Sequence, residues 1–277
     1  MTNTTPRTTI ISVCYNSTAV IPAMLASVPE GVDVVLVDNA SSDAAELAAL
    51  AASHSARLIR SEENRGFGVG CNLGAAAATT EFLLFLNPDA QLLDGAIAAL
   101  ETAMDCYPKA SAMNPRITEA DGSAYFKRRS VLLPRKDHMP RGWPDADREV
   151  SILSGAAMFI RRRDFEAVGG FDPKIFLYHE DDDLSLRLKA ERGPLMFIRD
   201  AAVRHIGGSS TARNPASAAF KAWHMGRSRV YAGRKHGQPV GYLSAALQLV
   251  SPAMILSARY RAKKWAFFRG MISALKG

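Results

Sequence analysis

The sequence predicts an α/β protein in which helices flank a mostly parallel central sheet, with a helical extension at the C-terminus. Short apolar runs rich in β-branched residues alternate with helical segments through the first half, as in a parallel sheet covered on both faces. Polar residues follow the ends of three of these runs. From Asn214 onward the pattern is helical. Ligands of such sheets bind beyond the carboxyl ends of the strands, so those ends form the candidate site.

The first half contains four predicted strands and three predicted helices. The strands are short and apolar, which is typical of strands buried on both faces. Asp43 begins a capping-box pattern, D-A-A-E, ahead of an Ala/Leu-rich helix, and a Gly-rich turn leads into the next helix. In order, the elements are strand 8–15, strand 32–39, helix 44–55, strand 57–64, turn and helix 64–80, strand 81–89 and helix 94–107.

The second half has a less regular pattern. Residues 118–150 are polar, with scattered Pro and Arg, and we expect a long loop with one short strand. A strand over 150–162 and a short helix precede the sequence GGFDP. Four acidic residues then open a helix that runs to about Arg192, and residues 194–208 form the last strand.

The composition is that of a globular protein with one large domain or two closely packed halves. The chain has 277 residues, of which 48% are hydrophobic and 22% charged. Cys14, Cys71 and Cys106 are odd in number and lack metal-ligand spacing, which indicates reduced thiols in a cytosolic protein. The N-terminus has no basic region followed by an apolar segment, so we expect no secretory signal.

The net charge of +7 is unevenly distributed. Residues 1–200 carry 21 basic and 27 acidic residues, whereas no Asp or Glu follows Asp200 and thirteen Lys and Arg do. A basic tail on an acidic body favours an anionic partner: lipid headgroups, nucleic acid or a phosphorylated substrate. No recognition motif for nucleic acid accompanies the charge, so we expect no nucleic-acid partner.

Three strand ends carry candidate functional residues. Asp38 is placed to accept hydrogen bonds from a ribose or a base, or to serve as a turn residue. The segment NRGFGVGCNLG is Gly-rich like a phosphate loop but matches no such motif, and a turn that permits close packing is the alternative. Asp89, in the sequence Asn-Pro-Asp, is suited to hold a divalent cation against a diphosphate, although Asn-Pro-Asp is also a common turn.

The acidic cluster Glu180–Asp183 follows the apolar-aromatic run 175–178. A helix dipole stabilises an N-terminal carboxylate by roughly 0.3–1 kcal/mol, which accounts for one or two acids but poorly for four in succession. A partly dry wall would raise the pKa of a carboxylate toward that of a useful base. We therefore predict a catalytic role for the cluster, in which Asp183 caps the helix 183–192.

Taken together, these segments resemble the family 2 glycosyltransferases, and most closely the rhamnosyltransferase-like branch that builds bacterial surface polysaccharides. The resemblance covers residues 8–208 and is carried, in order, by VDNASSD, ENRGFGVGCNLG, FLLFLNPDA, SGAAMFIRR, GGFDPKIFLYHEDDDLSLRL and RHIGGSS. It implies a GT-A fold with a Rossmann-like sheet, a nucleotide-diphosphate-sugar donor, a divalent metal (manganese or magnesium) and inversion at the anomeric carbon. Residues 1–112 would then be the nucleotide-sugar-binding half, 113–208 the acceptor and catalytic half, and 209–277 the basic extension.

The resemblance also implies roles for individual residues. The family places its base in an acidic pair followed by Asp-Leu, so Asp181 would take the proton of the acceptor hydroxyl and Glu180 would bind a sugar. Asp89 and His205 would hold the metal, although many members have Asp-x-Asp where this chain has Asn87, and a lone His is also often structural. The other donor-site candidates are Ser12, Tyr15, Asn16, Asp38, Asn64, Arg65, Gly66, Asn72, Asn87, Ser154 and Gly155.

The C-terminal tail combines apolar and basic residues. Residues 240–258 are uncharged, but several polar residues and Pro252 argue against a membrane-spanning helix. Cations beside aromatics suit a helix in an anionic membrane interface; packing on the catalytic domain or on another subunit of a homo-oligomer is the alternative. We expect a peripheral protein at the cytoplasmic face of the inner membrane, with a glycan or polyprenyl-diphosphate-linked acceptor. The aromatic and aliphatic residues at helical spacing are Trp265, Phe268, Ile272 and Leu275.

The donor sugar stays open, and the alternative to an enzyme is a non-enzymatic scaffold that binds nucleic acid or a membrane through the basic tail. Such a scaffold would leave the acidic cluster and Asn-Pro-Asp unexplained, and the sequence argues against a nucleotidyltransferase. The motifs favour a dTDP-linked deoxysugar over a UDP-hexose. A sugar nucleotidyltransferase would carry a Gly-rich, Arg-containing loop after the first strand, and SVCYNSTAV contains neither Gly nor Arg. A catalytically inactive scaffold would bind a nucleotide in a metal-dependent way without turnover.

Overall fold

The computed structural model describes residues 6–206, 215–250 and 257–275. Its centre is a ten-stranded sheet of order β3-β2-β1-β4-β9-β6-β10-β5, with β7 paired to β6 and β8 paired to β10. The strands are β1 (Thr8–Cys14), β2 (Asp33–Asn39), β3 (Arg57–Ser61), β4 (Phe82–Leu86), β5 (Ala90–Leu92), β6 (Ala112–Thr118), β7 (Ala124–Tyr125), β8 (Arg148–Val150), β9 (Ala157–Arg161) and β10 (Leu195–His205). The helices are α1 (Ile21–Ala26), α2 (Ala44–Ser53), α3 (Phe67–Ala76), α4 (Ala96–Cys106), η1 (Arg135–Asp137), α5 (Arg162–Ala167), α6 (Glu180–Glu191), α7 (Pro215–Lys235), α8 (Tyr242–Leu247), η2 (Gln248–Val250) and α10 (Ala258–Ser273).

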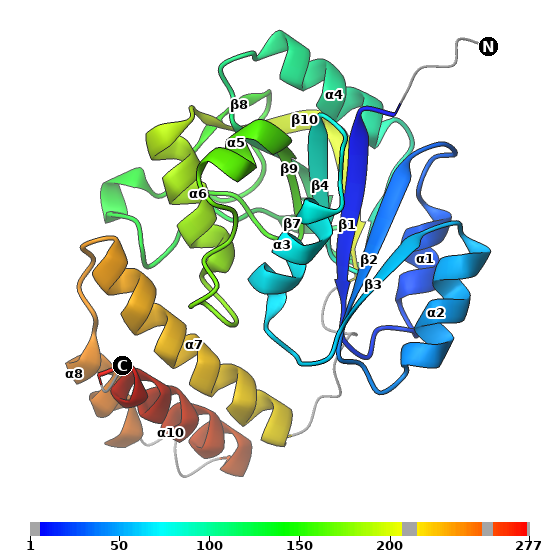
Figure 1. The fold of residues 1–277 in the computed structure, drawn as a ribbon. Helices are drawn as coiled ribbons and strands as arrows, with labels where there is room; N and C mark the ends of the chain where they lie inside the picture. Colours follow the sequence, from blue (N-terminus) through cyan, green and yellow to red (C-terminus); the bar gives the residue numbers. More distant parts are fainter. Residues whose placement is uncertain (1–5, 207–214, 251–256, 276–277) are drawn as a thin grey trace.

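Alternate side chains of the central strands face two separate hydrophobic clusters. In β1, Ile10 joins the cluster that includes residues of α1, α2 and α4, whereas Ile11 joins the cluster that includes residues of α3, α5 and α6. Helices therefore cover both faces of the sheet, as the continuous apolar strands predict (Figure 1). The predicted α/β class with a flanked central sheet is confirmed.

The direction of the strands brings several loop connections to one edge of the sheet. β1 is parallel to β2 and β4, and β2 is parallel to β3. β9 then runs antiparallel between β4 and β6, so the sheet is mixed beyond β4. The carboxyl ends of β1 and β2 point toward the C-terminal helix α7 (Figure 1). This edge is where an α/β sheet binds its ligands.

The glycines of α3 allow the helix to lie directly on the sheet. A Cβ on Gly70 would lie 2.7 Å from a methyl group of Val13, and a Cβ on Gly74 would collide with Ile11. Any larger residue would push the helix away from β1. At these two positions the Gly-rich pattern therefore serves close helix–strand packing, which was the alternative to a phosphate loop.

Several local features differ from the prediction. Helix α1 and strands β5 and β6 were not predicted, because they are short or interrupted by polar residues and Pro115. The region 118–150 contains β7 and β8 rather than one short strand. The expected capping box is absent at α2: the Asp43 carboxylate instead accepts hydrogen bonds from the backbone N–H and hydroxyl of Thr18, at 3.2 and 2.7 Å.

The C-terminal extension contains a pair of packed helices, α7 and α10, beyond the strand ends. α7 and α10 approach closely because each has a glycine at the crossing: a Cβ on Gly226 would collide with the carbonyl of Phe267, and a Cβ on Gly270 with the carbonyl of Trp223. Figure 1 shows the two helices lying side by side below the sheet. None of the helices in the described residues is long and apolar enough to cross a membrane.

Candidate active site

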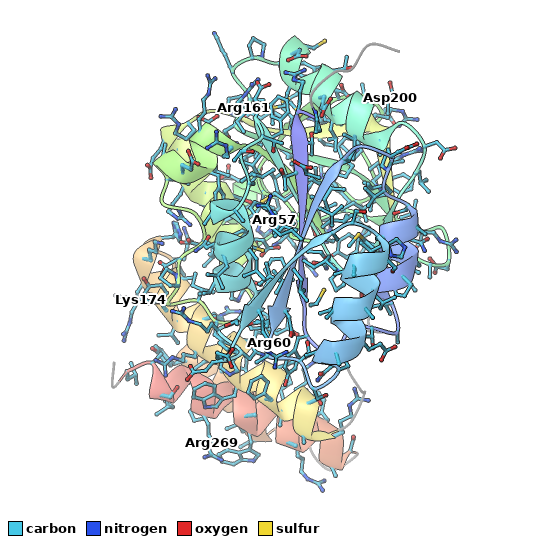
Figure 2. All side chains as sticks on the ribbon, turned by 45° about the vertical axis from the view of Figure 1, so that its right-hand side comes forward. Arg57, Arg60, Arg161, Lys174, Asp200 and Arg269 are labelled. Atoms are coloured by element: carbon cyan, nitrogen blue, oxygen red, sulfur yellow. The ribbon has the colours of Figure 1, made fainter. Side chains whose placement is uncertain are left out.

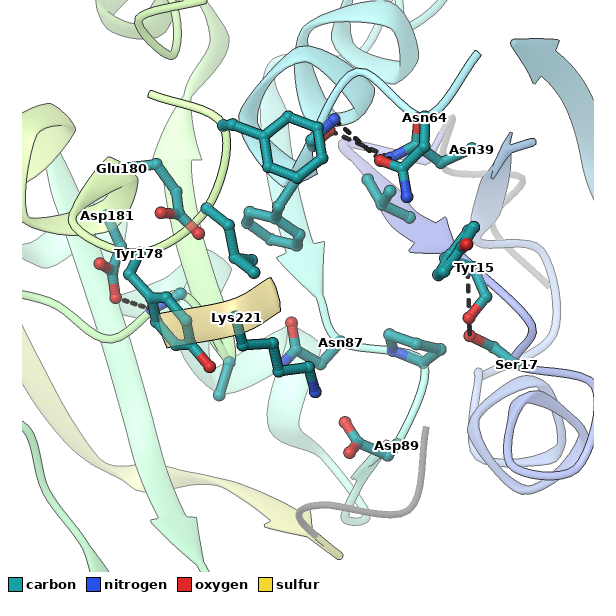
Figure 3. Close-up of a pocket in the computed structure, with 18 of the residues that line it drawn as sticks. Tyr15, Ser17, Asn39, Asn64, Asn87, Asp89, Tyr178, Glu180, Asp181 and Lys221 are labelled. Atoms are coloured by element: carbon teal, nitrogen blue, oxygen red, sulfur yellow. Dashed lines mark hydrogen bonds between the residues drawn. The ribbon is translucent and has the colours of Figure 1, made fainter. Parts of the chain in front are cut away.

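A cavity of about 730 Å³ lies at the carboxyl ends of β1, β2 and β4. The strand ends contribute Tyr15, Asn39 and Asn87, while the loop that precedes α6 forms the opposite wall (Figure 3). Helix α7 closes the cavity on a further side, with Phe220 and Lys221 among its lining residues. Segments far apart in the sequence therefore meet around one space, which is large enough for a small-molecule ligand.

Nine of the fifteen predicted site residues line this cavity, and the other six lie outside the lining that the described residues form. Those that line it are Tyr15, Asn64, Gly66, Asn87, Asp89, Ser154, Gly155, Glu180 and Asp181. Those outside the lining are Ser12, Asn16, Asp38, Arg65, Asn72 and His205, the last of which contacts the lining residue Asp89.

Asp38 and its neighbour Asn39, at the end of β2, are both held by contacts within the protein. The Asp38 carboxylate is buried, pairs with Arg60 at 2.6 Å and accepts the backbone N–H of Ser41 at 2.8 Å. Because side chains alternate along a strand, Asn39 faces the cavity, where its amide donates to Asn64 at 3.0 Å. The Asn39 amide also donates to the carbonyl of Gly66 at 3.2 Å and accepts the backbone N–H of Arg65 at 3.0 Å, so this buried side chain holds the loop 64–66 in place. The nucleotide-binding role of Asp38 stays a prediction.

Four other candidates lie outside the cavity lining: two make hydrogen bonds within the protein, one is buried and one is exposed. The Asn16 amide oxygen accepts hydrogen bonds from the backbone and hydroxyl of Ser42. Asn72 exchanges two hydrogen bonds with the backbone of Phe171, at 2.8 and 2.9 Å, and so fixes the GGFDP turn to α3. Ser12 lies buried within β1, and the Arg65 side chain is exposed.

The chain bends sharply just before α6, and this bend aims the acidic cluster. Tyr178 and His179 both have positive φ, 67° and 69°, a conformation that non-glycine residues seldom adopt. The strain is of order 1–3 kcal/mol per residue and requires surrounding support. Part of that support is the hydrogen bond from the Ser228 hydroxyl of α7 to the carbonyl of Leu177, at 2.9 Å. Strained backbone held in this way is frequent at functional sites.

Asp183 fastens α6 to α7 and does not cap its helix. The helix begins at Glu180 with His179 as the N-cap residue, so the predicted start at residue 183 is wrong. The Asp183 carboxylate is fully buried and lies 2.8 Å from Lys235 and 2.7 Å from His236, both at the end of α7. Burial opposes its ionisation, but these partners lower the pKa of Asp183 to about 2.

A partly buried lysine from the 118–150 region neutralises the middle of the cluster. The Lys127 ammonium lies 2.5 Å from an Asp181 oxygen and 2.7 Å from an Asp182 oxygen. The same Asp181 oxygen accepts the backbone N–H of Gly155 at 2.9 Å, and His179 lies 2.8 Å from Asp182. Burial opposes the charge on Lys127, yet the two carboxylates raise its pKa well above the usual range. Asp181 is therefore held in one orientation at the cavity wall.

Glu180 is the carboxyl group of the cluster with an unusual affinity for a proton. Its side chain is buried, and its Oε2 has no hydrogen-bond partner among the described residues. Burial, together with the negative charge of Asp181, raises the pKa of Glu180 to about 8. At neutral pH this group is mainly protonated and can donate a hydrogen bond into the cavity.

This raised pKa predicts a pH dependence of stability. An unfolded glutamate ionises near pH 4.5, so between that pH and about 8 the folded state binds more protons at Glu180 than the unfolded state does. The contribution of Glu180 to the free energy of unfolding therefore falls as the pH rises through this window. We expect Glu180→Gln to flatten the fall of the melting temperature between pH 5 and 8. If the melting temperatures of wild type and variant fall in parallel across that pH window, the raised pKa of Glu180 is contradicted.

Asp89 and His205, the two residues predicted to hold a metal, lie side by side. His205 Nε2 lies 3.3 Å from an Asp89 oxygen, and its Nδ1 is buried without a partner among the described residues. Burial opposes protonation of His205, but Asp89 outweighs it and raises the pKa of the imidazole. No group of three or more acidic, His or Cys side chains within the described residues forms a full ligand set. The pair therefore suits an ion that takes its other ligands from a diphosphate and water.

The sequence interpretation missed two basic residues of this site. Lys127 lies in a polar region without regular secondary structure. The sequence indicates only that four adjacent acids require a nearby cation, and it does not indicate which one. Lys221 comes from α7 and extends toward Asn87 and Asp89 (Figure 3). The sequence does not distinguish Lys221 from the other twelve Lys and Arg that follow Asp200.

The sheet order and the cavity at the strand ends agree with the GT-A fold of glycosyltransferases. Two of the solved structures that share this fold illustrate the similarity. The mannosyltransferase PcManGT from Pyrobaculum calidifontis, in complex with GDP-Man and Mn2+, superposes with a TM-score of 0.61 at 18% identity, over 99% of this chain and 88% of that chain. The TarS 1-349 structure from S. aureus gives 0.59 at 14% identity, over 98% of this chain and 92% of that chain.

The chain belongs to glycosyltransferase family 2, whose family model matches residues 9–169. It is 30% identical to an N-acetylglucosaminyl-diphospho-decaprenol L-rhamnosyltransferase of Mycobacterium tuberculosis (strain CDC 1551 / Oshkosh), over 92% of this chain and 95% of the relative. It is 27% identical to the low-salt glycan biosynthesis hexosyltransferase Agl10 of Haloferax volcanii, over 66% of this chain and 61% of that relative. The predicted family and enzyme class are confirmed.

Proposed function

We propose that this protein is a metal-dependent, inverting glycosyltransferase that moves a deoxysugar such as rhamnose from a nucleotide-diphosphate donor to a hydroxyl of a lipid-linked acceptor. The observation that carries the proposal is one cavity lined both by Asp89 and by the pair Glu180–Asp181. An inverting transfer requires a charge partner for the leaving diphosphate and a base for the attacking hydroxyl. The name of the mycobacterial relative gives it a diphosphate-linked lipid acceptor, which supports the same acceptor class here.

The donor would occupy the side of the cavity formed by β1 and β2. Tyr15 offers a partly exposed aromatic face for a base. Asn64, whose amide oxygen is held by Asn39, offers its amide nitrogen for a hydrogen bond. Lys221 lines the same cavity as Asp89 and offers an ammonium group to the diphosphate. A dTDP-linked deoxysugar is the donor that the motifs favour, with a UDP-hexose as the alternative to be assayed beside it.

Asp89 and His205 would hold the divalent cation, manganese or magnesium. When bound, this cation supplies positive charge that offsets the negative charge of the departing nucleotide diphosphate. Lys221 would add to that charge from the α7 side, so that the leaving group is bound from two directions.

The acceptor would approach the wall formed by the acidic cluster. Asp181 takes the proton of the acceptor hydroxyl as its oxygen bonds to the anomeric carbon and the bond from that carbon to the diphosphate breaks. The hydrogen bond from the Gly155 backbone and the ion pair with Lys127 hold the Asp181 carboxylate in place for this step. Glu180, protonated at neutral pH, donates a hydrogen bond to a sugar oxygen.

The three regions of the chain would have separate tasks. Residues 1–112 bind the donor, residues 113–208 supply the base and the acceptor wall, and residues 209–277 form a basic extension. A lipid-linked acceptor lies in a membrane, so the enzyme would act as a peripheral protein at the cytoplasmic membrane surface, with the basic extension facing anionic lipid.

Thermal unfolding with UDP, dTDP, GDP and CDP, with and without manganese, tests the donor site. We expect one nucleotide to raise the melting temperature in a metal-dependent way, by about 5–10 °C at roughly one hundred times its Kd. Asp89→Ala should abolish the shift because it removes the anionic member of the cation pair. The matched control is Asp94→Ala, which removes an exposed carboxylate outside the cavity lining. A shift retained in Asp89→Ala, or no shift with any nucleotide, would contradict the proposal.

A further inference from the structure

A second cavity, of about 360 Å³, lies within the C-terminal extension, between α7, α8 and α10. Three cations line it: Arg229 from α7 and Lys263 and Lys264 from α10. Neutral polar side chains from Ser244 and Gln248 complete its polar wall. The cavity is separate from the candidate active site, since the two have no lining residue in common.

No ion pair within the described residues neutralises the charge of this cavity; Lys264 donates a hydrogen bond to the neutral side chain of Gln248. No Asp or Glu occurs anywhere in residues 201–277. Arg229 is half-buried, and no hydrogen bond or ion pair joins it to another of the described residues. Burial lowers the pKa of its guanidinium, so the folded protein holds a cation there at a cost. An anion that enters the cavity would remove that cost.

The helical turn that forms one wall of the cavity is apolar on its outer side. Leu243, Leu247 and Val250 follow one another at helical spacing, and their exposed fractions are 74%, 59% and 78%. Ser244 and Gln248 of the same segment point into the cavity. A soluble anion would make no use of this aliphatic stripe. An anion with an attached hydrocarbon chain would pair with the cations and would also remove Leu243, Leu247 and Val250 from water.

We propose that this cavity binds the phosphate of an anionic phospholipid headgroup, while Leu243, Leu247 and Val250 enter the interface of the same membrane. Arg229 supplies the forked donor suited to phosphate oxygens, and Lys263 and Lys264 supply point charges. The inference names the surface through which the proposed enzyme would reach its lipid-linked acceptor. Lipid binding itself requires no sugar transfer, so the two proposals can fail independently.

Co-sedimentation with vesicles tests the site on the full chain. Vesicles of phosphatidylcholine mixed with phosphatidylglycerol should bind the protein, and vesicles of phosphatidylcholine alone should bind it weakly. We expect Lys263→Gln and Arg229→Gln each to weaken binding about five- to tenfold, since each would lose a direct charged contact with the phosphate, which a cation outside the cavity does not make. Lys263 is exposed, so its replacement leaves folding intact even if Arg229→Gln does not.

The matched control is Arg269→Gln, which removes the same charge from α10 at an exposed position outside the cavity (Figure 2). It should change vesicle affinity by less than about twofold. If Arg269→Gln and Lys263→Gln weaken vesicle binding equally, the overall charge of the tail causes the binding and the proposed phosphate site is wrong. Full competition by inorganic phosphate, together with unchanged binding in Leu243→Ser/Leu247→Ser, would assign the cavity to a free phosphate and overturn the lipid. Transfer to a water-soluble acceptor should be unaffected in all these variants.

Discussion

Asp181→Asn is expected to lower kcat by about 10²–10⁴-fold while the KM for the donor stays within about twofold, because general-base catalysis contributes on that scale. The substitution keeps the size of the side chain but removes its capacity to accept the proton of the acceptor hydroxyl. Asp181 lines the cavity opposite the strand ends that would bind the nucleotide. Steady-state kinetics, with nucleotide binding measured on the same protein, separate the chemical step from donor binding.

Asp182→Asn is the matched control for this experiment. It makes the same chemical change one residue along, on a carboxylate that pairs with Lys127 and His179 and lies outside the described lining of the cavity. We expect its kcat to fall by less than about tenfold. A larger loss in Asp182→Asn than in Asp181→Asn would transfer the role of base away from Asp181.

Lys127→Met is expected to lower the free energy of unfolding by about 3–5 kcal/mol, the usual effect of removing one partner from a buried ion pair. Its side chain is 20% exposed, and it is the cation that contacts both Asp181 and Asp182. Met is similar in length to the aliphatic part of Lys, so the decrease in the free energy of unfolding measures the loss of the positive charge. Urea unfolding of wild type and variant at pH 7 measures the difference.

A double variant distinguishes an electrostatic cause from a packing cause. Lys127→Met/Asp182→Asn should be more stable than Lys127→Met alone, because the second change removes one of the carboxylates that the first left unpaired. If the two losses simply add, Lys127 stabilises the protein through packing and the electrostatic account of the cluster does not hold.

The parts of the fold that the sequence predicts are those set by local pattern. The strands β1, β2 and β4 are short apolar runs, and their positions agree with the ranges expected. The acidic cluster was singled out because four adjacent carboxylates conflict with simple helix stability. The pattern also indicated a ligand site at the strand ends, and the cavity lies there. It did not indicate that the carboxylate of Asp38 pairs with Arg60, which comes from the neighbouring strand β3.

The remaining parts depend on contacts between distant segments, which periodicity does not encode. Lys127 reaches the cluster from a region without regular structure, 54 residues before Asp181. Asp183 receives Lys235 and His236 from a helix that packs on it only in the tertiary fold. Side-chain alternation fixes which strand-end residue faces the cavity, but this needs the register of the whole sheet.

The most direct test of the proposed reaction is the analysis of its product. The purified protein would be incubated with manganese, a dTDP-linked deoxysugar and an N-acetylglucosaminyl-diphospho-polyprenol acceptor, and the product examined by mass spectrometry and NMR. We expect an acceptor that has gained one deoxysugar, with the anomeric configuration inverted relative to the donor, and at least about a hundredfold less product in the same time with Asp181→Asn. A product of retained configuration, or no product from any nucleotide sugar that the protein demonstrably binds, would contradict the assignment of Asp181 as the base of an inverting transfer.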